Sequence, residues 1–316
     1  MAEKAINALT GLEKSEEQRF HFDIYAVFEG SQELYFGHET QININMVETV
    51  KLKTVERELE KCYLSPTKRR GIERRSLIWA PMSNGLLLGD NLGCGIPHTC
   101  GKTTCPICSV FGALIPRETK VKLINGKEET RKATTLIGRV VHGGGVAIQD
   151  LDPEIKQRAM HPSMIKKEGE DMPNPFKIQY NEPSLLYPVY NHCLSITETE
   201  FGAVAYAFLD SLARLGAGNP KGVKIFEYKL FTDSRESLIV LDKYRSPLGK
   251  RPVISPFINN IEDALNQFKD CSCTVFGNKH NSNHIEEGDF ERWIGDTALT
   301  KLQEYASEFV KEVLNA

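Results

Sequence analysis

Apolar and polar residues alternate between positions 20 and 28, and this alternation predicts the first strand of a sheet. The apolar positions share one parity, so one face of the strand is expected to lie on a core; they are Phe20, Phe22, Ile24, Ala26 and Phe28. A second strand, rich in aromatic and β-branched residues, is predicted over 186–196. A strand pair is predicted over 223–230 and 238–241.

Two other stretches repeat apolar residues at intervals of three and four, the spacing of an amphipathic helix. The first follows Thr197, which has capping-box spacing with Glu200, and it is expected to end at Gly216. The second covers 299–314. A helix is also predicted between 46 and 63, from the helical spacing of Leu52, Val55, Leu59 and Cys62.

The order of these elements predicts an α+β protein, a sheet with helices on one face, which is the plan of ferredoxin-like and RNA-recognition folds. Residues 119–141 predict a β-hairpin with Asn125-Gly126 as its turn. Its two arms carry Val121 and Leu123 on one side, and Thr134, Leu136 and Val140 on the other. The tract from 150 to 183 is rich in Pro, Gly and charge, and it predicts a long irregular excursion.

Five metal-ligating side chains lie between positions 94 and 108, and four of them suffice to hold one tetrahedral zinc ion. We predict His98, Cys100, Cys105 and Cys108 as the ligands, with Cys94 as an alternative ligand. Four protein ligands leave no open position for a substrate, so the zinc is predicted to be structural. A redox CxxC pair, or a chance cluster of buried cysteines, is the competing interpretation.

A second cluster combines C-x-C and H-x3-H spacing near the C-terminus, in Cys271, Cys273, His280 and His284. It is either a second zinc site or a loop with incidental cysteines. Eight cysteines, most of them at metal spacing, fit a reducing compartment better than a disulfide framework. The sequence has no apolar run of about 20 residues and no signal-peptide pattern, so we expect a cytoplasmic protein with no membrane partner.

The net charge of −3 does not itself indicate a nucleic-acid binder, but the basic residues are locally concentrated. One run comprises Lys68, Arg69, Arg70, Arg74 and Arg75, and a second extends from Arg117 through Lys120, Lys122, Lys127, Arg131 and Lys132. A glycine-rich loop bracketed by cations contains Arg214, Gly216, Gly218, Asn219 and Lys221. Each set either contacts a phosphate backbone or is a solvated face or a turn.

Catalytic motifs such as GxSxG and HExxH do not occur in the sequence. His142, which precedes three glycines, is either a general base or, as is more common for a lone histidine, a packing residue. Enzymatic activity is therefore not the function that the motifs favour.

A C-P-x-C-x-x-F-G knuckle, here CPICSVFG over 105–112, follows the basic residues Lys68 to Arg75. In this it resembles the backbone subunits of CRISPR effector complexes, which belong to the RAMP superfamily. A helix ending in L-x-x-L-G-A-G-x-x-K-G, within 201–224, is similar to the helix and glycine-rich loop that follow in that family. The order and spacing are most similar to the type I-D backbone subunit, and the resemblance covers residues 20–245.

The resemblance implies a modified RNA-recognition core with a thumb-like hairpin, over 119–141 by position, and a zinc-bearing lid. Copies would stack into a filament that holds guide CRISPR RNA by its backbone and leaves the bases free for target nucleic acid, beside other effector-complex subunits. RNA contacts would fall on the basic residues from Lys68 to Arg75 and on the 216–221 loop. The aspartate with which type III relatives cut target RNA has no matched position in this chain.

The expected organisation is an RNA-recognition-like core over 18–90 and 185–260, interrupted by insertions. These are a zinc knuckle over 91–116 and a thumb-like hairpin with a long loop over 117–184. A C-terminal extension with an amphipathic helix covers 261–316. The predicted function is that of a non-catalytic RNA-binding subunit. The alternatives are a RAMP-type endoribonuclease that cuts target or precursor RNA, and a zinc-stabilised scaffold that binds only protein.

Overall fold

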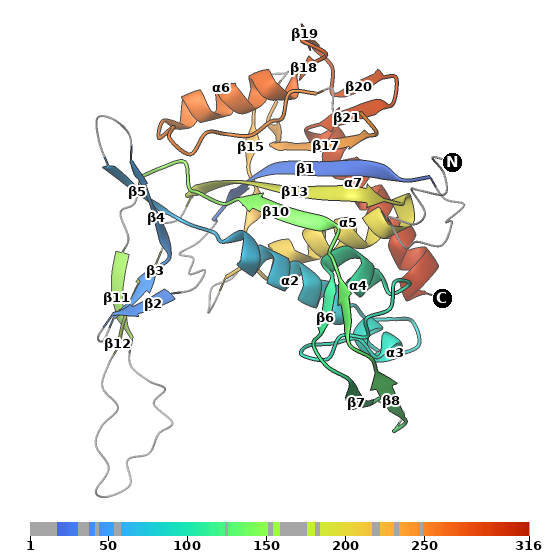
Figure 1. Ribbon diagram of the computed structural model, residues 1–316. Helices are drawn as coiled ribbons and strands as arrows, with labels where there is room; N and C mark the ends of the chain where they lie inside the picture. The colour runs from blue at the N-terminus through green and yellow to red at the C-terminus, as the bar shows by residue number, and fades with distance from the viewer. Residues whose placement is uncertain are drawn as a thin grey trace, which may run out of the picture.

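One antiparallel sheet forms the centre of the protein (Figure 1). The computed structural model describes residues 18–30, 38–41, 44–53, 58–123, 126–150, 154–158, 176–180, 184–216, 222–230, 234–246 and 249–315. The strands lie in the spatial order β10 (Val140–Gly144), β13 (Leu186–Ile196), β1 (Phe20–Glu29), β17 (Ile239–Tyr244), β21 (Phe290–Ile294) and β20 (His284–Glu287), and β14 (Lys224–Ile225) also pairs with β1. The strands predicted over 20–28 and 186–196 are therefore central neighbours, with Tyr25 opposite Tyr190.

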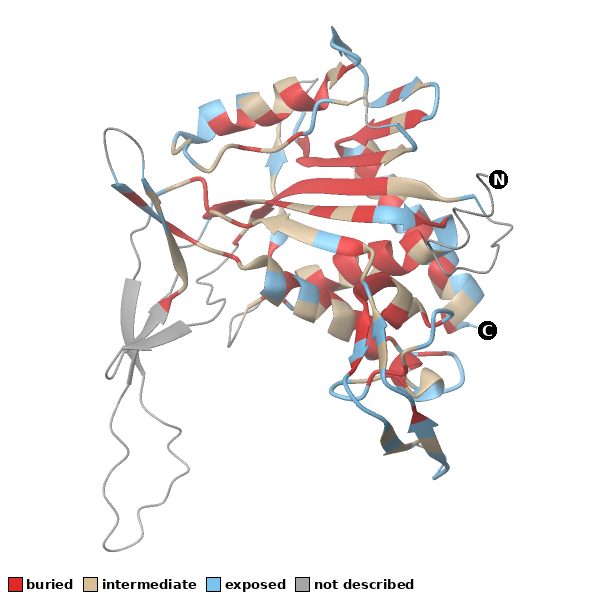
Figure 2. Ribbon diagram, viewed as in Figure 1, coloured by how far each residue is buried: buried red, intermediate tan, exposed pale blue. Residues whose placement is uncertain are grey.

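Both faces of β1 are buried, so the prediction of helices on one face only is wrong. Phe22, Ile24, Ala26 and Phe28 pack into one core with the helices α2 (Pro66–Ile78), α5 (Glu198–Leu212) and α7 (Asp296–Phe309). On the opposite face, Tyr25 and Val27 join a second core that includes α6 (Ile261–Ser272). Figure 2 shows this strand as an almost continuous buried band. The intervening positions are themselves large and apolar, which is why both faces exclude water.

Two of the predicted helices are present with the expected local signals. In α5 the Thr197 hydroxyl accepts a hydrogen bond from the Glu200 amide at 3.1 Å, and the Glu200 carboxylate accepts one from the Thr197 amide at 3.0 Å. This reciprocal capping box satisfies amides that would otherwise lack a partner. The helix ends at Leu212, one turn before Gly216. The C-terminal helix is also confirmed: α7 continues into a π-helical turn, η1 (Val310–Leu314).

The prediction of a helix between 46 and 63 is wrong, because the segment forms strands. β3 (Ile44–Val47) is followed by the hairpin of β4 (Thr49–Lys53) and β5 (Glu58–Cys62), in which Leu52 and Leu59 face each other across the pair. Val55 lies outside the described residues. Alternating Thr, Val, Leu and Lys favour a half-buried strand, and here the two-residue period outweighs the helical spacing.

The tract from 150 to 183 also contains strands where none was predicted. β11 (Glu154–Arg158) pairs with β12 (Phe176–Tyr180), and β12 pairs with β3, which pairs with β2 (His38–Gln41). The rest of this tract, at 151–153, 159–175 and 181–183, lies outside the described residues. Four further short strands form two small ladders: β15 (Glu227–Tyr228) with β16 (Glu236–Ser237), and β18 (Thr274–Val275) with β19 (Asn278–Lys279).

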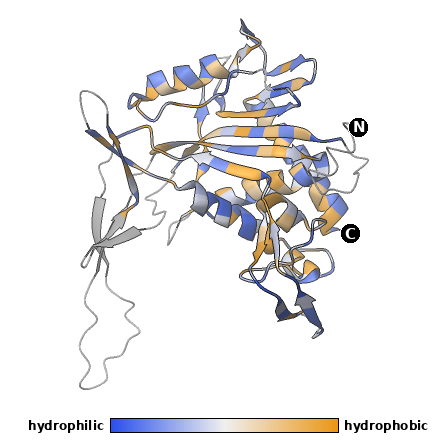
Figure 3. Ribbon diagram, viewed as in Figure 1, coloured by the Kyte–Doolittle hydropathy of each residue, from blue (hydrophilic) through white to orange (hydrophobic). Residues whose placement is uncertain are grey.

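A compact insertion separates α2 from β10. It contains α3 (Leu88–Leu92), α4 (Pro106–Phe111), β6 (Ala113–Ile115), β7 (Thr119–Lys122), β8 (Glu128–Arg131) and β9 (Thr134–Leu136). The predicted hairpin exists as the β7–β8 pair, but Thr134 and Leu136 pair with β6 instead, and Val140 enters the central sheet. Asn125 of the predicted turn lies outside the described residues. Figure 3 shows β7–β8 as the hydrophilic end of this insertion.

A buried ion pair fastens α6 to the sheet. Arg292 on β21 is fully buried and donates two hydrogen bonds to the Asp242 carboxylate on β17, at 2.6 and 2.7 Å. The same guanidinium donates to the carbonyls of Cys271 and Ser272, at the end of α6, each at 3.1 Å. None of the described helices is long and apolar enough to cross a lipid bilayer.

Replacing this arginine is expected to destabilise the protein strongly. Arg292→Ala leaves the Asp242 carboxylate buried without its partner, which costs about 3–5 kcal/mol in the free energy of unfolding. Urea unfolding followed by circular dichroism measures the change. Lys279→Ala is the matched control, because its ion pair with Asp270 at 2.7 Å is exposed and should change stability little. Equal losses for the two variants would contradict the argument.

Candidate metal centre and nucleic-acid interface

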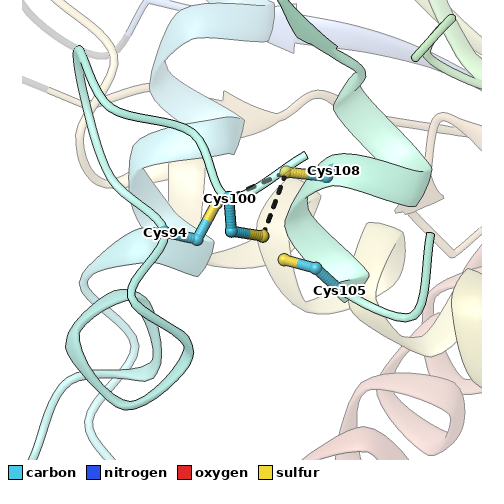
Figure 4. A group of neighbouring side chains, drawn as sticks. All are labelled: Cys94, Cys100, Cys105 and Cys108. Atoms are coloured by element: carbon cyan, nitrogen blue, oxygen red, sulfur yellow. Dashed lines mark hydrogen bonds between the residues drawn. The ribbon is translucent and has the colours of Figure 1, made fainter. Parts of the chain in front are cut away.

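Four buried cysteines meet in the insertion (Figure 4). Cys94 follows α3, Cys100 lies in the next loop, and Cys105 and Cys108 lie at the start and in the first turn of α4. The Sγ atom of Cys108 is 3.4 Å from that of Cys94 and 3.6 Å from that of Cys100, and all four sulfurs lie within 4.8 Å of one another.

This donor set fits zinc. A Zn–S bond of about 2.3 Å in tetrahedral geometry places sulfurs about 3.8 Å apart, close to the separations seen here. Hydrogen bonds among the four thiols lower the pKa of Cys100 and raise the pKa of Cys94 and Cys105, so the fit to zinc rests on the sulfur geometry. Zinc held here would supply only cross-linking between α3, the loop and α4, because four sulfurs complete its coordination.

The predicted ligand set needs one correction. His98 is exposed and is not part of the cluster, whereas Cys94, the alternative ligand, is. The loop between Cys94 and Cys100 turns back on a hydrogen bond from the Gly95 amide to the His98 carbonyl, at 3.0 Å. Both ends of the loop therefore reach the cysteine cluster, and the His98 imidazole does not.

Of the two interpretations of the second cluster, the structure does not support the zinc site, because its four residues form no common group of metal-ligating atoms. Cys271 and Cys273 lie at the end of α6, where burial raises the pKa of each thiol. His284, on β20, lies instead beside the carboxylates of Glu286 and Glu291. The C-x-C and H-x3-H halves lie on different elements, and no spacing rule could have shown whether those elements meet.

Arg131 has a structural role that its place in a basic run did not reveal. It is buried, and its guanidinium donates to the carbonyls of Gly93, His98 and Thr99, the last at 2.7 Å. Its Nε donates to the Glu129 carboxylate at 3.2 Å. The arginine on β8 therefore holds the backbone just before Cys94 and just before Cys100, and we do not retain it as an RNA contact.

Arg69 is likewise internal. Its guanidinium donates to Asn191 Oδ1 at 3.2 Å and to the carbonyls of Gly143 and Tyr190 at 2.8 and 3.1 Å, and burial lowers its pKa to about 10. The Asn191 amide donates in turn to the Glu73 carboxylate at 3.0 Å, which also pairs with His142 at 2.8 Å. This network joins α2 to β10 and β13, and it makes His142 a packing residue rather than an accessible base.

Some of the remaining cations of α2 form ion pairs or hydrogen bonds within the protein. Lys68 forms an ion pair with Glu48, and Arg70, although exposed, donates to the Phe111 carbonyl. Arg74 and Arg75 are half-buried, and among the described residues the Nε and one terminal nitrogen of Arg74 have no hydrogen-bond partner. Arg69 is therefore excluded as an anion contact, and the unpaired nitrogens of Arg74 are themselves buried.

The hairpin offers a more open set of cations. Lys120 and Lys122 on β7, and Lys132 just after β8, are exposed. In the glycine-rich loop, Arg214 is exposed and pairs with Asp210 at 2.6 Å, and Gly216 is half-buried. Gly218, Asn219 and Lys221 lie outside the described residues. The hairpin is therefore the clearest predicted contact surface among the described residues.

A polar network on the α6 side of the sheet was not predicted. The buried Asp23 carboxylate accepts hydrogen bonds from Tyr25 and Tyr244 at 3.0 and 3.1 Å and pairs with His192 Nδ1 at 2.9 Å. Arg251 reaches the other imidazole nitrogen and donates to the Tyr25 hydroxyl at 3.2 Å. The only signal in the sequence is an aspartate inside an apolar strand, because apart from Tyr25 on β1 itself the members of the network come from β13, β17 and a distant loop.

No protein-family model and no curated protein matches the sequence. Solved structures similar to this chain include the crystal structure of Thermofilum pendens Csc2, with 18% identity and a TM-score of 0.34 over 65% of this chain. The match covers 63% of that protein, less than two thirds of its length. A "CRISPR RNA-guided surveillance complex" chain has 12% identity and a TM-score of 0.40, covering 78% of this chain and 80% of that one. A "Type IV-B CRISPR Complex" chain has 11% identity and a TM-score of 0.35, and the match covers 77% of this chain and 98% of that one.

We expect one zinc ion per chain, measured by plasma mass spectrometry after purification without added metal. Cys94→Ser and the pair Cys105→Ser with Cys108→Ser should lose it, because each removes a ligand from a closed four-sulfur set. His98→Ala is the matched control and should retain the full zinc content. Loss of zinc in His98→Ala, or a metal-free wild-type protein that is fully folded, would overturn the assignment.

Proposed function

We propose that this chain is a non-catalytic backbone subunit of a CRISPR interference complex. It binds the guide RNA along its phosphate backbone and assembles with copies of itself into a filament, beside other effector-complex subunits. The order of the knuckle, helix and glycine-rich loop resembles the type I-D backbone subunit most, and we propose that subtype. The observation that supports the proposal most is the strand order of the central sheet.

That order is compatible with an RNA-recognition core. In chain order the elements β1, α2, β10, β13, α5 and β17 form a β-α-β-β-α-β series, and in space the strands lie as β10, β13, β1 and β17, all antiparallel. A split β-α-β arrangement of this kind is the ferredoxin-like plan on which RNA-recognition modules are built. The metal-bearing insertion interrupts it between α2 and β10, as the family resemblance implies.

The distribution of charge supports contact with a backbone rather than with bases. The exposed lysines of β7 have flexible side chains that can neutralise phosphates without sequence preference. A net charge of −3 is compatible with this, because only the surface along the RNA has to be positive. We assign the predicted thumb to β7–β8, a smaller element than the 119–141 hairpin.

A second candidate function, RNA cleavage, is favoured by one observation, the pairing of Asp23 with His192. A carboxylate that orients an imidazole is a common acid–base arrangement. In this structure, however, Arg251 occupies the second nitrogen of the imidazole, so His192 has no site free to accept a proton from a substrate. We therefore place binding ahead of cleavage.

The hairpin lysines should contribute measurably to RNA affinity. Lys120→Glu with Lys122→Glu is expected to weaken binding of a mixed-sequence single-stranded RNA and to reduce the slope of log K against log salt by about 1.4, for two lost phosphate contacts. Fluorescence anisotropy across a salt series measures both. Lys301→Glu with Lys311→Glu, on the C-terminal helix, is the matched charge reversal and should keep the wild-type slope. Failure of the wild-type protein to bind RNA at all would favour a protein-only scaffold.

Incubation of the purified protein with labelled repeat RNA and with complementary target RNA separates binding from cleavage. We expect both RNAs to remain intact with and without divalent metal, on denaturing gels. Cleavage by the wild-type protein that His192→Ala abolishes would establish the endoribonuclease instead. Cleavage that survives in His192→Ala would point to a contaminating nuclease.

A further inference from the structure

A cleft of about 300 Å³ lies between the end of α2 and the loop that connects Cys94 to Cys100. Its lining includes Trp79 and Asp90, Ile96 and His98 from the loop between Cys94 and Cys100, and Lys122 from β7. Trp79 and Ile96 are among the most exposed large apolar side chains of the described residues, at 55% and 59%. Hydrating an exposed tryptophan is unfavourable. An exposed tryptophan that lines a cleft therefore suggests that a ligand covers it.

Both walls of the cleft are held in place. Behind Trp79, the Leu88 amide donates to the Ala80 carbonyl at 2.9 Å. Gly89 brings the walls together, because a Cβ there would lie 2.6 Å from the Cys94 carbonyl and 2.8 Å from that of Ile78. On the other wall, Arg131 holds the carbonyl of His98 at 3.2 Å. The cleft is therefore preformed and loses little conformational entropy when it is filled.

The polar groups of the cleft identify its ligand by chemistry. A plain phosphate is disfavoured by the Asp90 carboxylate, and lysine is depleted in protein–protein interfaces, which disfavours a second copy of the chain. An indole face beside a cation, an imidazole and a carboxylate matches a nucleobase, with a π-face for stacking and polar edges for hydrogen bonds. Lys122, and Lys120 two residues before it on the same face of β7, lie where the attached phosphates would pass.

We propose that this cleft holds one unpaired nucleobase of a bound single-stranded RNA, stacked on Trp79. The inference rests on the proposed RNA binding and extends it, because it assigns a base contact beside the backbone contacts of the hairpin. It also gives His98 a role, since the four cysteines complete the metal centre without it.

The fluorescence of Trp79 provides a direct measurement of base stacking. The chain has two tryptophans, and the other, Trp293, is buried and stacked on His284. A mixed-sequence single-stranded RNA should quench the fluorescence of Trp79, whereas an RNA of the same length with abasic positions should bind with little quenching. Trp79→Ala should weaken binding of the base-containing RNA by roughly 5- to 150-fold, the range for loss of one stacked base, with little effect on the abasic RNA.

Phe257→Ala is the matched control, because Phe257 is another exposed aromatic residue, at 49%, and should bind RNA like the wild-type protein. Trp79→Phe should retain most of the affinity but lose the fluorescence change. Wild-type affinity in Trp79→Ala, with no quenching in the parent, would overturn this inference and leave the proposed function standing. Loss of self-association in Trp79→Ala, with RNA affinity unchanged, would assign the cleft to a second copy. Absence of RNA binding by the wild-type protein would overturn both proposals.

Discussion

The burial of β1 on both faces is the constraint on which the rest of the architecture depends. One side of the strand holds Phe22 against Phe201, with ring centroids 4.0 Å apart, and the other holds Tyr25 and Val27 against the α6 layer. Full burial of a phenylalanine or valine side chain contributes about 1.5–3 kcal/mol. A strand of this kind can lie only in the middle of a sheet between two layers, so it fixes β13 and β17 as its neighbours and places α5, α7 and α6.

Around this core, buried cations serve as structural ties. Arg69 joins α2 to β10 and β13, Arg292 joins α6 to β17, and Arg131 joins the hairpin to the loop between Cys94 and Cys100. In each case the guanidinium donates to backbone carbonyls, which are otherwise difficult to satisfy away from water. The planar fork of arginine suits this role better than the single ammonium of lysine. Other cations remain exposed at the surface, and the lysines of the hairpin are among them.

The four-cysteine cluster and the tryptophan cleft share one residue, Cys94. Cys94 contributes a sulfur to the cluster and also lines the cleft, and the same loop carries Ile96 and His98 toward solvent. A structural metal that fixes this loop would thereby fix the shape of a surface beside it. This gives a physical reason for a metal knuckle at the edge of a proposed RNA-binding surface, without any chemistry at the metal.

The sequence alone determined the elements whose signals are local. The alternation from Phe20 to Phe28, the capping box of Thr197 with Glu200 and the cysteine spacing around Cys105 each act within a few residues, and each is present in the structure. Only the tertiary structure decided which cations are internal, that Cys94 and not His98 joins the cluster, and that Asp23 meets His192 and Arg251. Burial and side-chain convergence depend on residues far apart in the chain, and neither residue type nor spacing carries that information.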